Sequence, residues 1–88
     1  MQESTIKKNS FYGCNGMIEK NGLGYIILDI DKKYIQGIWQ KLDSQDNFKM
    51  PIVEFEFLIR TNLIEFVEIL PDFVIIDYKK VYEKNLTS

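Results

Sequence analysis

The sequence predicts a small α+β domain, with a three- to four-stranded sheet carrying one or two short helices on one face. Three observations favour it. The 88 residues include 13 Ile but no Ala, which favours strands over helices. An almost unbroken apolar run occupies 23–30, and two further segments, 31–43 and 63–70, have helical periodicity. The alternative is an all-β small barrel, which follows if both of those segments are strands.

The chain is short enough for one domain. We expect a single globular domain over 11–82, because the apolar residues concentrate there. Residues 1–10 are polar and predict a flexible N-terminal arm, and residues 83–88 predict a frayed C-terminus.

The first predicted strand pair is a hairpin. Asn21-Gly22 is a strong hairpin signal, because both residue types tolerate the positive φ of a type I′ turn. Residues 16–19 would then pair with the strand 23–30. Since this second strand is apolar on both of its sides, we expect both of its faces to be covered.

The segment 31–43 is expected to be a helix. Its five large apolar residues fall on one helical face, with lysines and glutamines on the other. Gly37 and the β-prone residues around it leave a strand as the alternative. A polar loop over 43–47 follows.

The second half of the chain is expected to form strand, helix and strand. Residues 52–59 alternate apolar side chains with Glu54 and Glu56, the pattern of a strand with one solvated face. Residues 63–70 fit a helix that Asn62 caps and Pro71 ends, or alternatively a strand that pairs back on 52–59. Residues 73–78 predict a last buried strand.

Composition excludes several kinds of chemistry. With no His and a single Cys, the chain can form neither a structural zinc site nor a Ser–His or Cys–His nucleophile. The glycines do not have the spacing of a phosphate-binding loop. We therefore expect no enzyme activity, no metal and no cofactor.

Source and compartment are also inferred from composition. Residue types with AT-rich codons, such as Ile, Lys, Asn, Phe and Tyr, are abundant, whereas Ala is absent and Arg60 is the only arginine. This indicates an AT-rich genome, bacterial or of a phage or other mobile element. No signal peptide or membrane-spanning run is present, so we expect a cytoplasmic protein without membrane contact.

The candidate binding residues are aromatic or charged. Within 54–77 there are six acidic residues and one basic residue, which suits docking of a basic partner. The net charge of −2 argues against nucleic acid. Aromatic anchors and charged groups together give the candidate set Trp39, Tyr34, Tyr25, Tyr12, Arg60, Glu65 and Glu68.

Three functions are compatible with these features. The first is a small non-catalytic inhibitor, of the anti-defence or immunity type, that binds a larger protein partner. The second is a homo-oligomer that holds a small molecule or nucleotide in a pocket between subunits, with Arg60 on a phosphate. The third is a self-assembling structural protein.

Overall fold

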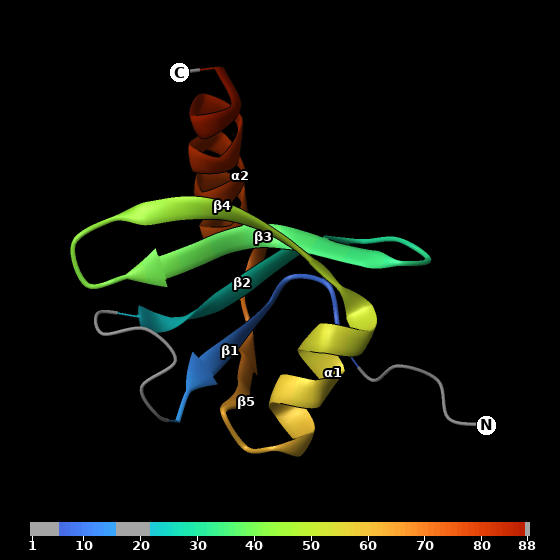
Figure 1. Cartoon of the computed structure of the whole chain (residues 1–88). Coiled ribbons are helices and arrows are strands. Elements are labelled where there is room, and N and C mark those ends of the chain that lie inside the picture. Colours follow the sequence, from blue (N-terminus) through green and yellow to red (C-terminus); the bar gives the residue numbers. More distant parts are fainter. Residues whose placement is uncertain (1–5, 16–21, 88) are drawn as a thin grey trace.

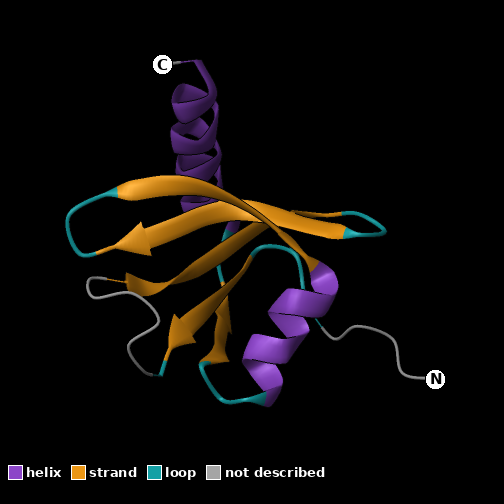
Figure 2. Cartoon of the chain, in the orientation of Figure 1, coloured by secondary structure: helices purple, strands orange, loops and turns teal. Residues whose placement is uncertain are grey.

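A five-stranded antiparallel sheet carries one helix on each face in the computed structural model, which describes residues 6–15 and 22–87 (Figures 1 and 2). The α+β class is confirmed, with five strands rather than three or four. Strands and helices follow the order β1 (Ser10–Cys14), β2 (Gly22–Ile30), β3 (Tyr34–Lys41), β4 (Gln45–Pro51), α1 (Ile52–Arg60), β5 (Ile64–Ile69) and α2 (Asp72–Thr87).

The strand order is β4-β3-β2-β1-β5. The first four strands form an antiparallel meander, and β5 returns to pair with β1. Strand β2 therefore lies at the centre of the sheet, while β4 and β5 are its two edges. This position matches the apolar run over 23–30, and the strand predicted there is confirmed.

The two faces of the sheet bury separate apolar clusters. On one face Phe55 of α1 packs against a cluster that includes Tyr25 and Trp39. On the other face Ile75 of α2 packs against Ile26 and its neighbours. The helices thus lie on opposite faces, whereas the sequence pattern predicts both on one face. Their presence excludes the all-β alternative.

Residues 34–41 form a strand, so the helix predicted over 31–43 is wrong. Gly37 gives the physical reason, because a Cβ atom there would lie 1.9 Å from the carbonyl oxygen of Ile26 on β2. Only glycine permits this close approach of two strand backbones. The turn before β3 is fixed by Asp31, whose Oδ1 accepts hydrogen bonds from the backbone N–H groups of Lys33 and Tyr34, both at 2.8 Å.

Residues 52–60 form a helix, so the strand predicted over 52–59 is wrong. The alternating pattern conceals a second, helical stripe formed by Ile52, Phe55, Leu58 and Ile59, all of which join the cluster beneath α1. Glu54 in the first turn and Arg60 in the last turn also suit the helix dipole.

The last two elements also exchange their predicted types. Residues 64–69 form β5 instead of a helix, and residues 73–78 lie in α2 instead of a strand. Asn62, with φ at 61°, reverses the chain after α1. Pro71 precedes α2, and its carbonyl accepts hydrogen bonds from the N–H groups of Val74 and Ile75. The helix continues through 83–87, the predicted frayed end.

The hairpin leading into β2 uses β1 as its first strand, with Phe11 opposite Ile26. The predicted strand 16–19 and Asn21 of the predicted Asn21-Gly22 turn lie outside the described residues. Within the predicted arm, Ile6 is buried in the cluster beneath α1 and Ser10 is fully buried. The flexibility of that arm stays a prediction.

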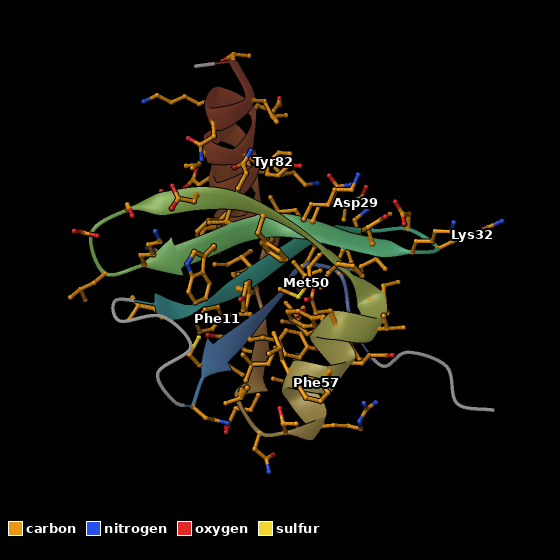
Figure 3. The ribbon with its side chains drawn as sticks, viewed as in Figure 1. Phe11, Asp29, Lys32, Met50, Phe57 and Tyr82 are labelled. Atoms are coloured by element: carbon orange, nitrogen blue, oxygen red, sulfur yellow. The ribbon has the colours of Figure 1, made fainter. Side chains whose placement is uncertain are left out.

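Two phenylalanines of α1 test this packing. Phe55 is fully buried, whereas Phe57 is 52 % exposed on the same helix. Phe57 is labelled on α1 in Figure 3. Replacing Phe55 with Ala should lower the free energy of unfolding by about 3–5 kcal/mol, because it leaves a cavity in the core. Phe57→Ala is the matched control and should cost less than about 1 kcal/mol. Denaturant unfolding measures both, and equal losses would contradict the assignment of the buried face of α1.

Candidate protein-binding surface

Three of the candidate aromatic residues lie in the core. Tyr12, Tyr25 and Trp39 are each less than 10 % exposed. The rings of Tyr25 and Trp39 are 4.4 Å apart between centroids, and Tyr12 and Tyr25 both meet Phe55 of α1 edge-on. These side chains therefore join the sheet to α1. Their burial does not support the prediction that they are surface anchors for a partner.

Tyr34 and Arg60 lie near the surface but far from each other. Tyr34 begins β3 and pairs with Pro51, directly before α1, while Arg60 ends that helix. The Nζ atom of Lys49 lies 4.7 Å from the centroid of the Tyr34 ring, a cation–π contact. The two residues thus mark opposite ends of α1 and do not form one phosphate site.

Glu65 and Glu68 lie on β5, an edge strand of the sheet. β5 pairs with β1 along one side, and no other described strand pairs with its outer side. Both glutamates are exposed, and neither forms a salt bridge within the described part of the chain. Both residues are thus exposed on one strand, whereas the sequence pattern assigns them to a helix, and their role in binding stays a prediction.

A β-bulge decides which way the side chains of β5 point. Tyr12 lies opposite Phe66, but the preceding residue, Phe11, lies opposite Glu68, so Val67 is the extra residue. Directly opposed residues share a face of the sheet, and a bulge turns an additional side chain towards one face. The faces can then be assigned from the residues of β1.

Phe66 points to the face that α1 covers. Its ring meets the Tyr12 ring edge-on at a centroid distance of 5.7 Å, and Tyr12 in turn meets Phe55 of α1 at 5.1 Å. Phe66 also lines a shallow open groove of about 250 Å³ between β5 and α1. The other residues that line this groove are Lys7, Tyr12 and Ile59.

The opposite face of β5 is acidic. Phe11 packs into the cluster beneath α2, so Glu68 opposite it faces the α2 side. Glu65 lies opposite Gly13, two residues along from Phe11 and therefore on the same face. The Val67 side chain is also on this side, 3.2 Å from the position of a Cβ on Gly13.

Apolar side chains are unusually exposed along β5. Phe66, Val67 and Ile69 are 46 %, 48 % and 52 % exposed, on a strand in which only Ile64 is buried. We define the β5 surface as Glu65, Phe66, Val67, Glu68 and Ile69. The helix predicted over 63–70 places Phe66 and Val67 on its buried face, so the sequence pattern gives no signal of their exposure.

Two further surface depressions are small and open. One, of about 300 Å³, lies beside α2 and Tyr82 (Figure 3), whose hydroxyl donates a hydrogen bond to Gln36 Oε1 at 2.9 Å. It contains Lys8 and Asp29, whose charged atoms are 3.9 Å apart. The other, of about 280 Å³, lies along the opposite side of α2, between Phe73 and Val81.

Cys14 is the cysteine of this chain and is half-buried. Burial raises the pKa of the Cys14 thiol above its usual 9.0, which disfavours the nucleophilic thiolate at neutral pH. Among the described residues, no three His, Cys, Asp or Glu side chains gather in a way that could hold a metal ion.

No helix within the described ranges has both the length and the apolar character needed to cross a membrane.

Comparison with known proteins gives no relative. No family model, no curated protein and no solved structure matches the chain.

The phenol of Tyr12 tests the packing around the groove. Burial raises its pKa above the usual 10.0, and hydrogen bonds with the Lys7 backbone and Ser10 lower it by less. The ionised phenolate is disfavoured in the fold. Ionisation of Tyr12 should therefore leave the free energy of unfolding unchanged below pH 10.0 and should lower it as the pH rises through the folded pKa.

The measurement is an ultraviolet pH titration of the wild type minus that of Tyr12→Phe. We expect the difference to report ionisation above pH 10.0, moving back towards 10.0 when Phe66→Ala opens the groove. A Tyr12 pKa at or below 10.0 in the wild type would show that the ring is not buried as described.

Proposed function

We propose that this chain is a small non-catalytic binding protein that inhibits a larger protein partner by covering it with the β5 surface. The observation that carries the proposal is the outer edge of β5, with which no other described strand pairs and which displays Phe66, Val67 and Ile69 to solvent. Exposed apolar patches and uncapped strand edges are costly in a free protein, and they mark interaction sites.

A protein partner suits this surface better than a small molecule. Ligand sites usually enclose roughly 300–1,000 Å³ within a concave pocket. The groove beside Phe66 has about 250 Å³ and is open. An exposed surface with a few apolar anchors is instead typical of protein interfaces, where hot spots near the centre supply most of the affinity.

Charge indicates what kind of partner binds. Residues 61–78, which contain β5 and the first turns of α2, have four acidic residues and neither Lys nor Arg. The negative electrostatic potential of these residues accelerates the approach of a basic surface and repels an acidic one. We therefore assign the partner a basic patch around an apolar centre.

The abundance of residue types with AT-rich codons supports a source in a phage or mobile element. Inhibition of a host protein is a natural role for a small chain whose composition offers no Ser–His or Cys–His nucleophile. Inhibition of this kind requires only that the β5 surface cover a functional region of the partner. No substrate and no cofactor enter this account.

Charge reversal on β5 tests the proposal. The tagged chain is used to recover partners from a lysate of an AT-rich bacterium, and each purified partner is titrated against the variants by calorimetry. Glu65→Lys combined with Glu68→Lys should weaken binding about tenfold or more, because two favourable interfacial charges become repulsive.

The matched control reverses two exposed carboxylates elsewhere, Asp43→Lys in the β3–β4 turn and Glu83→Lys on α2. It changes the net charge by the same amount and should alter the affinity less than about threefold. Equal losses in the two double variants would overturn the β5 surface as the binding site.

A further inference from the structure

The outer edge of β5 presents backbone groups as well as side chains. An edge strand has a row of N–H and C=O groups that no neighbouring strand satisfies, which makes it a template for another strand. β5 spans six residues, Ile64–Ile69, and is paired only with β1 among the described strands. Six residues are a typical strand length.

The other edge of the sheet is partly covered by α2. β4 is largely polar, and α2 crosses it with side-chain hydrogen bonds. Asn85 Nδ2 donates to the Gln45 carbonyl at 3.1 Å, and Asn47 Nδ2 donates to the Tyr82 carbonyl at 2.9 Å. Cover by a helix is one usual means of blocking an edge, and the hydrogen bonds that α2 makes with β4 have no counterpart on the outer edge of β5 among the described residues, although Glu65 and Glu68 place charges on that strand.

We infer that an extended segment of the partner, carrying basic and apolar side chains in alternation, joins the sheet as a sixth strand beside β5. This inference rests on the proposed function and adds the mode of recognition to it. In binding of this kind the backbone hydrogen bonds supply affinity, and the side chains on the two faces supply specificity.

The two faces of β5 define which side chains fit. On the α2 face, Glu65 and Glu68 would meet neighbouring side chains of the added strand, and opposite charges favour cross-strand pairs. On the α1 face, the groove beside Phe66 would receive an apolar side chain against the Tyr12 and Ile59 walls. Adjacent residues of a strand point to opposite faces, so basic and apolar side chains must alternate along the partner segment.

A second copy of this chain fits the edge poorly. Two β5 strands can pair antiparallel only about a two-fold axis perpendicular to the sheet, which keeps each side chain on its own face. Glu65 and Glu68 of both copies would then gather on one face of a two-strand seam. Residues 61–78 contain no cation to neutralise these four carboxylates, and like charges across strands destabilise pairing.

The test uses the whole chain and synthetic peptides of alternating lysine and valine, detected by amide shifts in ¹H–¹⁵N NMR spectra. We expect shifts and slowed hydrogen exchange centred on Ile64–Ile69. A peptide of alternating glutamate and valine is the charge control, and it should bind at least about tenfold more weakly.

Backbone pairing is separated from side-chain docking by N-methylation. Two versions of the lysine–valine peptide carry N-methyl groups on either the odd or the even residues, so each version blocks one edge of the peptide. Strand addition requires one version to lose binding while the other retains it. No binding of the parent peptide, equal behaviour of the two versions, or shifts centred away from β5 would each overturn the inference.

Failure of strand addition and failure of the proposed function give different results. If the recovered partner requires Glu65 and Glu68 while N-methylation has the same effect at both edges, the β5 surface still binds the partner but strand addition is excluded. If the charge-reversed variant binds the partner normally, the proposed function itself fails, whatever the peptides do.

Discussion

Strand β2 is buried on both faces, and the rest of the fold depends on covering it. Tyr25 and Ile27 point into the cluster beneath α1, while Ile26 and Leu28 point into the cluster beneath α2. A sheet with two apolar faces needs a layer on each, because neither face can be left in water without a large loss of buried apolar area. The two helices provide these layers from opposite sides (Figure 1).

Two short helices cover the centre of the sheet but leave β5 exposed. Helix α2 is anchored over β3 and β4, where Tyr82 bonds to Gln36 and Asn85 bonds to Gln45. Helix α1 packs beside β5, but an open groove remains between Ile59 of the helix and Phe66 of the strand. The exposed apolar side chains of β5 are thus a consequence of where the cover ends, and that surface is the one we assign to a partner.

The sequence predicts the centre of this fold better than its periphery. The apolar run over β2 favours a strand, because it is short, bounded by Gly22 and Asp31, and rich in isoleucine. Elsewhere local pattern misleads: Gly37 is required by the close approach of Ile26, and α1 uses a stripe around Phe55 that the alternating glutamates conceal. Charge makes Glu65 and Glu68 candidate binding residues, but the exposure of Phe66 follows only from the edge position of β5.

Hydrogen–deuterium exchange of the chain alone and in complex with its recovered partner tests the central claim most directly. In the free protein the edge amides of β5 should exchange faster than those of β2, which is paired on both sides. Our account expects binding to slow exchange over Ile64–Ile69 while β4 is unchanged. Protection confined to β4 or to the outer side of α2, with β5 exchanging as in the free chain, would contradict it.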